Sequence, residues 1–212
     1  MNISTPFSKK FVSLLFAGVM AVPGLVYGQS FKIDATDPKF DSLDSPEFGG
    51  NTGRKKFKPK SWLEMEVKLN VSAPESIAKD GYVDGVTIKW YVAAKDPAQK
   101  GKGYILLEKQ VEYLNIPVGE DIYASVYLSP GAVERLSGSK RASKSVIEVV
   151  GGEILFQGRL ITRFTSKSMG SKSDWWNSGN LSRMDGIPLR NKNETPFKAL
   201  WWDRYAEIKD EK

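Results

Sequence analysis

The 212-residue chain contains neither cysteine nor histidine. Without cysteine it cannot form a disulfide framework, so a conventional apolar core must hold the domain together. The usual zinc ligand sets and every Ser-His-Asp or Cys-His constellation are excluded as well. An enzyme with this composition would have to act through carboxylates, lysine or tyrosine. We therefore expect a protein that is not an enzyme and that binds no metal or cofactor.

Long apolar runs are equally scarce, and the single one covers residues 11–27. Lys9 and Lys10 precede it, as in the positively charged region of a secretory signal peptide. It is shorter than the ~20 residues of a membrane span, and Pro23-Gly24 interrupts it. We expect a signal peptide over residues 1–28, cleaved between Gly28 and Gln29. The alternative is an apolar segment that stays attached as an anchor.

Charge of either sign is not strongly in excess, because 31 lysines and arginines face 25 acidic residues for a net +6. Removal of residues 1–28, with two lysines and no acid, leaves 29 against 25, or +4. The only dense basic cluster, Arg54–Lys60, lacks the context of a nucleic-acid-binding stripe. We expect no nucleic-acid partner, whereas contact with an acidic glycan or an anionic lipid stays open.

Alternation of apolar and polar residues is the strongest structural pattern. In Leu63–Val71 every odd-numbered residue is apolar and every even-numbered one polar, which predicts a half-buried strand. Val86–Val92 predicts a second strand, with Val86, Ile88, Trp90 and Val92 on one face. Further strands are predicted at residues 104–113 and 122–128.

The helix signal follows these strands. Ser129 stands as N-cap, Pro130 at the first helical position and Gly138 as terminator, which predicts a short helix over residues 130–137. Six to eight short strands with one small helix favour an all-β fold, an immunoglobulin-like antiparallel β-sandwich. We assign residues 29–60 to a flexible N-terminal arm, in which residues 30–33 could add an edge strand, and residues 61–212 to the sandwich domain.

The second half of the chain gives weaker signals. Gly151-Gly152 predicts a hairpin turn between strands at residues 145–150 and 153–164, and Gly158 predicts a bulge in the second of them. Farther on, Pro188-Leu189 and residues 199–202 are the most plausible strands in a polar tail.

Two tryptophan pairs hold four of the six tryptophans. Trp175 and Trp176 could form a stacking platform for sugar rings, and they are the candidate contact residues for a ligand or partner. The competing interpretation, which we favour for this pair and for Trp201-Trp202, is that the rings fill the core or lock the C-terminal segment to the sheet.

Paired carboxylates suggest a glycosidase, in which two acidic groups flank the bond to be cleaved. Glu64 with Glu66 and Glu108 with Glu112 are the candidate pairs. Even spacing on a strand directs both members of each pair to the outer face, where we expect solvated side chains rather than catalysis.

The block Asn193-Glu194-Thr195-Pro196-Phe197, followed by Trp201-Trp202-Asp203-Arg204-Tyr205, carries a family resemblance. Together with Leu63–Val71 and the Trp175-Trp176 segment, it resembles a small family of exported pilus-like proteins of verrucomicrobial gut bacteria, over most of the mature chain. The resemblance implies an immunoglobulin-like sandwich, genes near type IV pilus components, a place at the outer membrane or cell surface, and exposure to host mucosa. It implies no catalytic or cofactor residue.

One feature departs from a type IV pilin, which is cut before its apolar helix and polymerises through it. No prepilin junction lies between Lys10 and Phe11. We expect an exported protein of the periplasm, outer membrane or cell surface that acts through protein contacts in pilus-associated assembly, adhesion or host interaction. A carbohydrate-binding module for mucin-type glycans is the alternative.

Overall fold

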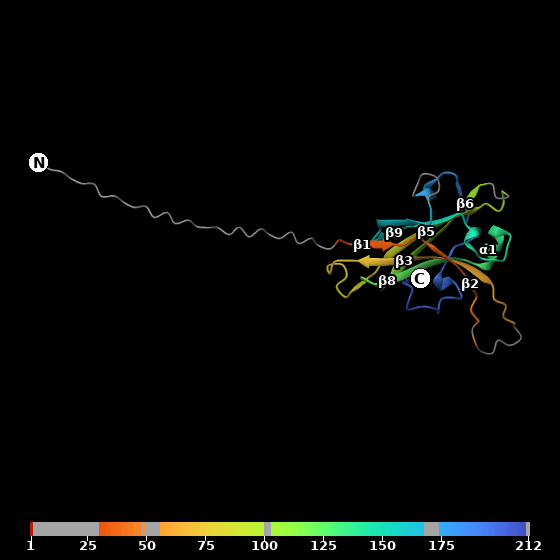
Figure 1. Ribbon diagram of the computed structural model, residues 1–212, viewed down its shortest axis with the longest axis horizontal. Helices are drawn as coiled ribbons and strands as arrows, with labels where there is room; N and C mark the ends of the chain where they lie inside the picture. The colour runs from red at the N-terminus through yellow and green to blue at the C-terminus, as the bar shows by residue number, and fades with distance from the viewer. Residues whose placement is uncertain (2–29, 48, 50–55, 100–102, 168–173, 211–212) are drawn as a thin grey trace.

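The computed structural model describes residues 1, 30–47, 49, 56–99, 103–167 and 174–210. Apart from Met1, the expected signal peptide and its cleavage point between Gly28 and Gln29 lie outside the described residues. Within them, no helix is both long and apolar enough to cross a membrane. The described chain folds into two packed β-sheets with one short α-helix at one end (Figure 1).

The first sheet, sheet A, is built on the long strand β3 (Ser61–Ser72). β8 (Asp121–Leu128) pairs with it on one side, in antiparallel register from Leu63 opposite Leu128. On the other side β3 pairs with β1 (Lys32–Ala35) and β2 (Lys39–Asp44), and the short β12 (Arg190–Asn191) adds to the far side of β8.

The second sheet, sheet C, centres on β5 (Val86–Lys95), which pairs antiparallel with β6 (Tyr104–Leu114) and β9 (Val149–Phe156). β10 (Arg159–Thr165) forms the edge beyond β9. Two short strands line the other side of β6, β11 (Leu181–Arg183) in parallel and β13 (Glu207–Ile208) in antiparallel. A separate pair joins β4 (Tyr82–Val83) to β7 (Ile116–Pro117).

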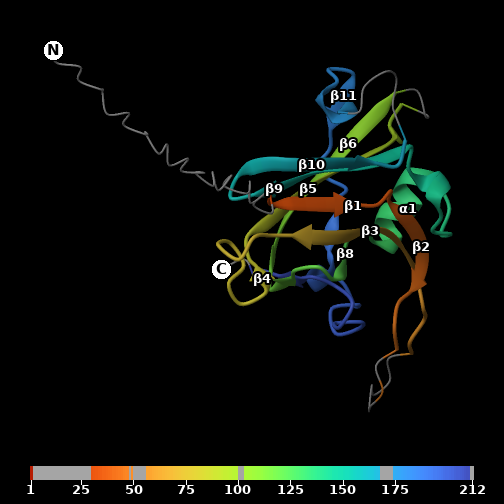
Figure 2. The same cartoon turned by 60° about the vertical axis from the view of Figure 1, so that its left-hand side comes forward.

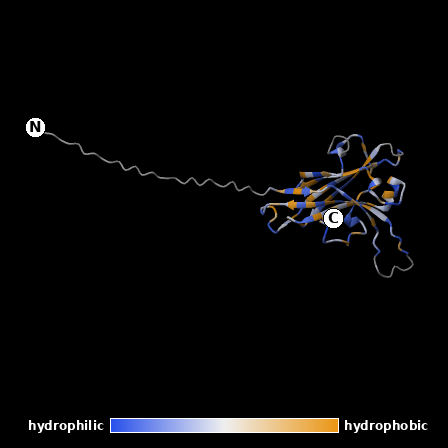
Figure 3. Cartoon of the chain, in the orientation of Figure 1, coloured by the Kyte–Doolittle hydropathy of each residue, from blue (hydrophilic) through white to orange (hydrophobic). Residues whose placement is uncertain are grey.

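The core lies between the two sheets, where the period-two pattern places the apolar side chains. The odd-numbered residues of Leu63–Val71 are all fully buried, as are Val86, Ile88, Trp90 and Val92, so both predicted faces are confirmed. Figure 3 shows hydrophobic and hydrophilic residues alternating along the strands. The predicted class, an all-β immunoglobulin-like sandwich, is confirmed.

The predicted helix is confirmed as α1 (Pro130–Ser137), with the Ser129 side chain accepting a hydrogen bond from the Ala132 amide and Gly138 in the left-handed conformation. The described part of the chain also contains three short 3-10 helices: η1 (Lys144–Val146), η2 (Trp175–Asn177) and η3 (Lys192–Glu194).

The N-terminal arm assigned to residues 29–60 needs correction. β1 and β2 lie within residues 30–47 and extend sheet A, so the sandwich begins before residue 61. Thr36 continues the pairing between them: its amide donates to the Lys68 carbonyl (3.0 Å) and its hydroxyl accepts from the Lys68 amide (3.1 Å). Ile33 is the apolar anchor that makes this addition favourable, since it is buried in the core.

The hairpin predicted at Gly151-Gly152 is displaced. Both glycines lie inside β9, and the turn to β10 is Gln157-Gly158, each with positive φ, as a two-residue hairpin turn requires. Gly158 is thus a turn residue, and the irregularity in β10 falls at Ile161. Residues 151 and 152 are glycines because a Cβ atom would meet Trp176 at 2.8 Å and Phe164 at 2.5 Å, respectively.

The strands predicted in the tail are also wrong in position. Pro188-Leu189 lies just before β12, and residues 199–202 form turns rather than a strand. Residues 190–206, which we call the C-terminal cover, cross from β12 through η3 along the outer face of sheet A. The chain then returns to β6 through β13. Figure 2 shows the dark-blue cover near β8.

Candidate functional site

Two carboxylates lie on the outer face of sheet A, beneath the C-terminal cover. Glu64 and Glu66 follow β3 at even positions and therefore leave the core on the same side of the sheet. Each is only 3% exposed. The expectation of solvated side chains is wrong for this pair, because the cover buries a strand face that sequence period alone assigns to solvent.

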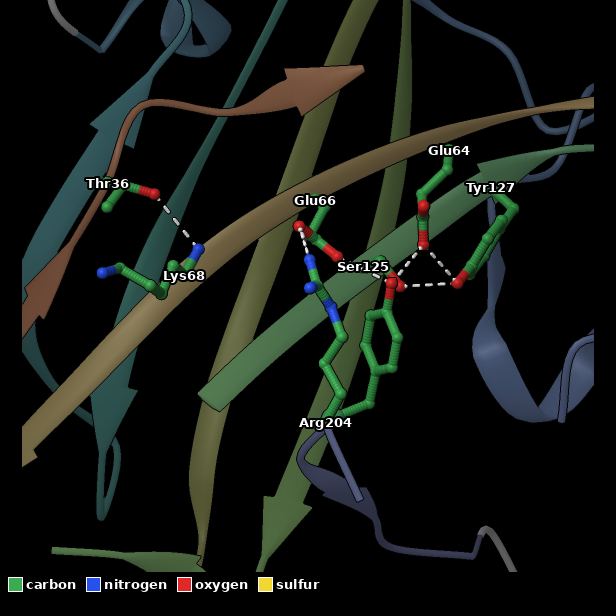
Figure 4. Close-up of polar contacts among 8 residues, drawn as sticks. Thr36, Glu64, Glu66, Lys68, Ser125, Tyr127 and Arg204 are labelled. Carbon is green, nitrogen blue, oxygen red and sulfur yellow. Dashed lines mark hydrogen bonds and ion pairs between the residues drawn. The ribbon is translucent and has the colours of Figure 1, made fainter. Parts of the chain in front are cut away.

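Tyrosine hydroxyls supply the hydrogen bonds that such burial requires. Tyr127, opposite Glu64 on β8, donates to Glu64 Oε1 at 2.6 Å and accepts from Ser125 at 2.8 Å. The Tyr205 hydroxyl lies 2.9 Å from Glu64 Oε1 and 2.6 Å from Glu66 Oε2. Figure 4 shows this chain of contacts running across the outer face of β3 and β8.

A guanidinium closes the cluster on the side of Glu66. Arg204 Nη2 lies 2.7 Å from Glu66 Oε1, and the guanidinium stacks on the ring of Tyr123 at 3.7 Å. The Arg204 side chain remains 45% exposed, while that of Glu66 is 4% exposed. The ion pair therefore fastens the end of the C-terminal cover to the sheet.

Burial changes the proton affinities of the groups under the cover. Desolvation raises the pKa of Glu64 above 4.5, against the lowering effect of the hydrogen bonds from Tyr127 and Tyr205. Desolvation also raises the pKa values of Tyr127 and Tyr205, and the nearby carboxylates add to both shifts. Both tyrosines are therefore neutral donors at any physiological pH.

Lys192 is a second cation under the cover, only 5% exposed. Its ammonium donates to the Lys198 carbonyl at 3.2 Å and lies 5.1 Å from the centre of the Tyr205 ring. Desolvation lowers its pKa, opposed by the charge of Glu64. Lys192 thus holds the start of the turn at residues 198–204 while Arg204 holds its end.

The two candidate glycosidase pairs lie in different sheets, and neither pair flanks an open cleft in the described chain. Glu108 and Glu112 lie on β6 in sheet C, where Glu108 pairs with Arg183 at 3.2 Å and Glu112 with Lys209 at 2.8 Å. Glu64 and Glu66 lie in sheet A with Tyr205 filling the space beside both carboxylates. No group of three or more metal-ligating side chains occurs among the described residues.

Trp175 and Trp176 lie on the outer face of sheet C and are buried, at 1% and 5% exposure. They pack with Ala93, Leu106 and Val149 in a small second core. Trp175 Nε1 donates to the Thr165 hydroxyl at 3.1 Å, and the Trp176 ring stacks on Tyr91 at 4.9 Å. Neither ring offers a free face to a sugar, which agrees with the core-filling interpretation.

Trp201 and Trp202 are the reverse case, because they are exposed by 45% and 79%. The interpretation that this pair fills the core is wrong, although the Trp201 ring stacks on the buried Phe197 with ring centres 6.3 Å apart. The turn that carries them projects from the sandwich, and Trp201 adopts a left-handed backbone conformation with φ of 51°. A non-glycine residue in that region is uncommon and marks a place where the surrounding contacts over-determine the backbone.

Edge strand β6 is only partly covered on the side that faces away from β5. β11 pairs with residues 104–106 and β13 with residues 113–114, so in the described chain residues 107–112 lack a strand partner there. The Met184 amide bonds to the Leu106 carbonyl and the Lys209 amide to the Glu112 carbonyl. By alternation along the strand, the backbone groups of Glu108 and Gln110 point to the same side.

A hollow of about 760 Å³ adjoins this stretch of β6. Its lining residues come from β6, from β12 and from the end of the chain: Gln110, Val111, Glu112, Asn191, Ile208, Lys209 and Asp210. We call residues 107–112 of β6, together with this hollow, the open edge. An unpaired strand edge presents backbone donors and acceptors in the spacing that another extended chain matches.

Sequence reasoning missed both the buried cluster and the open edge. The available signal for the cluster was chemical: the Trp-Trp-Asp-Arg-Tyr block provides a guanidinium and a phenol, and the Leu63–Val71 strand provides two unmatched carboxylates. No sequence pattern indicated the open edge, because it exists only where β11 and β13 pair with the two ends of β6 and leave its middle uncovered.

Comparisons with known proteins give one family match and a similar solved structure. A family model matches residues 25–212. A crystal structure of a protein from Akkermansia muciniphila superimposes with a TM-score of 0.78 at 32% sequence identity, covering 87% of this chain and 96% of that chain. No curated protein matches the chain.

Fold and site together define an immunoglobulin-like sandwich whose C-terminal cover is fastened to one sheet through buried carboxylates. The chain belongs to the family that the matching model describes, the immunoglobulin-fold family of verrucomicrobial gut bacteria that the C-terminal block resembles.

Proposed function

We propose that the protein is exported and works without catalysis, through protein contacts made in pilus-associated assembly or adhesion at the cell envelope. The observation that carries this proposal is the open edge. Its two outward-facing backbone pairs, at Glu108 and Gln110, can be satisfied by an extended segment of a partner that adds to sheet C. The adjoining hollow of about 760 Å³ gives room for side chains of such a segment.

The carboxylate cluster supports a structural role over chemistry. Glu64 and Glu66 are both 3% exposed, and they accept hydrogen bonds from Tyr127, Tyr205 and Arg204. A substrate would have to displace the cover before it reached either carboxylate. Catalytic carboxylates of glycosidases instead flank an open cleft. The paired charges beside the open edge, such as Lys109 with Glu194 at 3.0 Å, similarly have partners within the chain.

The test uses a substitution that changes only the backbone donor. Gln110→Pro removes an N–H that points away from β5 and leaves the β5–β6 pairing intact, because the odd-numbered residues of β6 make those bonds. Gln110→Ala is the matched control, since it removes the side chain and keeps the N–H. Tagged mature protein is incubated with bacterial envelope extract, cross-linked, and the captured proteins are quantified.

We expect wild type and Gln110→Ala to capture the same partner and Gln110→Pro to lose it by about tenfold or more. Equal capture by all three proteins would show that the open edge is not the contact. Recovery of glycan hydrolysis by the purified wild-type protein, lost in Glu64→Gln, would contradict the non-enzymatic proposal altogether.

A further inference from the structure

The exposed turn at residues 198–204, which we call the tryptophan turn, shares no residue with the open edge. Ala199, Leu200, Trp201 and Trp202 are four consecutive apolar residues at its tip, all exposed or partly exposed. Such a run at a protein surface is unfavourable in water unless something covers it. Among the described residues, Trp201 and Trp202 form the only pair of large exposed apolar side chains adjacent in sequence.

The fold fixes both ends of the turn. At its start, Lys192 donates to the Lys198 carbonyl, and Phe197, 1% exposed, stacks on Tyr127 with ring centres 5.6 Å apart. At its end, Arg204 and Tyr205 reach Glu66 at 2.7 Å and 2.6 Å. The turn is thus held at both ends, with the Trp201 ring stacked on Phe197 at 6.3 Å between ring centres and the Trp202 ring left 79% exposed.

The absence of a described hollow at the turn favours a deformable partner such as a lipid surface. The hollows beside β6, β4 and α1 are lined by other residues, and none of them includes residues 196–204. Small ligands and sugars usually bind in concave sites, and none of these five hollows reaches the turn. A protein partner would need a matching cavity, but a lipid interface closes around an apolar tip without one.

The residue types at the tip match a membrane interface. Tryptophan is enriched at the boundary between headgroups and acyl chains, where its ring is buried and its N–H stays hydrated. Lys198 and Asp203 are exposed on either side, and the charge of Arg204 is matched by Glu66, so the tip is close to neutral. Binding should therefore depend on the two rings and on Leu200 rather than on anionic headgroups.

We propose that the tryptophan turn inserts into the interface of a lipid bilayer and anchors the sandwich at the membrane surface. The two rings and Leu200 would sit at the level of the headgroups, with Lys198 among the phosphates. This surface is separate from the open edge, so lipid binding and protein capture can fail independently.

The experiment measures binding of the mature protein to phosphatidylcholine vesicles, with and without phosphatidylglycerol, by co-sedimentation and by the shift in tryptophan emission. Trp202→Ala is the first variant, because its ring is 79% exposed and supports little of the fold. Trp201→Gly with Trp202→Ala is the second, since glycine accepts the left-handed backbone at position 201. Tyr82→Ala on β4, at 50% exposure, is the matched control.

We expect wild type and Tyr82→Ala to bind both kinds of vesicle with a blue-shifted emission, in low and in high salt. The double variant should bind at least about tenfold more weakly, because interfacial binding follows the apolar area buried. Three results would overturn the proposal: no binding by wild type, equal binding by the double variant, or binding that high salt abolishes, which indicates adsorption by net charge. Tryptophan-dependent binding to a glycan or a protein, without vesicle binding, would assign the turn to that occupant instead.

Discussion

Glu64 and Glu66 share one phenolic hydroxyl. The Tyr205 oxygen lies 2.9 Å from Glu64 Oε1 and 2.6 Å from Glu66 Oε2, yet it carries a single proton and can donate to only one carboxylate at a time. A proton on Glu64 would satisfy the remaining contact. Desolvation raises the pKa of Glu64, so this residue keeps its proton to a higher pH than a solvated glutamate does.

This sharing predicts a pH dependence of stability. Since the folded-state pKa of Glu64 is raised above 4.5, the folded protein holds the extra proton between pH 4.5 and that raised pKa. The stabilisation is fully present below 4.5 and is lost as pH rises through the folded-state pKa. Glu64→Gln should flatten the fall in unfolding free energy over this window, as measured by urea denaturation. Glu108→Gln is the control, and an unchanged slope in Glu64→Gln would contradict the assignment.

Glu66→Gln should lower the unfolding free energy of the protein. It leaves the Arg204 guanidinium without its carboxylate and weakens the bond from Tyr205, at a cost of about 1–3 kcal/mol in unfolding free energy. The estimate is at the lower end of buried ion pairs because Arg204 is 45% exposed. Asp34→Asn, which breaks the exposed pair with Lys32, is the comparison and should change stability by less than about 0.5 kcal/mol. Equal effects of the two substitutions would rule out the fastening role of Glu66.

Gly151 should tolerate no side chain. A Cβ atom there would lie 2.8 Å from the Trp176 ring and 2.9 Å from the Phe164 carbonyl, and the backbone oxygen cannot move aside cheaply. Gly151→Ala is expected to lower the unfolding free energy by about 1–3 kcal/mol through overpacking. Gly179→Ala, with open space around the new methyl group, should be nearly neutral in thermal melts. A neutral Gly151→Ala would mean that the two tryptophans pack more loosely than described.

The mature N-terminus distinguishes two modes of action. Cleavage by signal peptidase gives a chain that begins at Gln29, and intact-mass measurement of the protein isolated from its native envelope should show that mass. A mass that retains residues 11–28 would point instead to a subunit that assembles through its apolar segment.

The sequence pattern correctly predicted the elements that depend on nearby residues alone, namely the Leu63–Val71 strand and α1. The alternation over Leu63–Val71 places five side chains in the core because strand geometry has a period of two, whatever packs opposite. The cap at Ser129 and the terminator at Gly138 define α1 for the same reason. The prediction of a hairpin turn at Gly151-Gly152 is wrong, because a glycine pair is equally compatible with a turn and with a close approach of another segment. Here the close approach of Trp176 and Phe164, which are distant in sequence, requires the glycines.

The site could not be predicted in the same way. Even spacing puts Glu64 and Glu66 on the outer face, which is correct, but their burial depends on Arg204 and Tyr205, about 140 positions farther along the chain. Likewise, the two tryptophan pairs look alike in sequence, although Trp175 and Trp176 cover the outer face of sheet C, whereas Trp201 packs only partly, on Phe197, and Trp202 stays exposed. Burial on an outer face is therefore a property of long-range contacts.

Hydrogen–deuterium exchange of the mature protein, compared with Tyr205→Phe, tests most directly whether the carboxylates fasten the C-terminal cover. This substitution removes one hydroxyl and keeps the ring. We predict faster exchange of amides 192–206, with the β9–β10 hairpin unchanged. Unchanged exchange in the cover, or faster exchange spread over both sheets, would contradict the account.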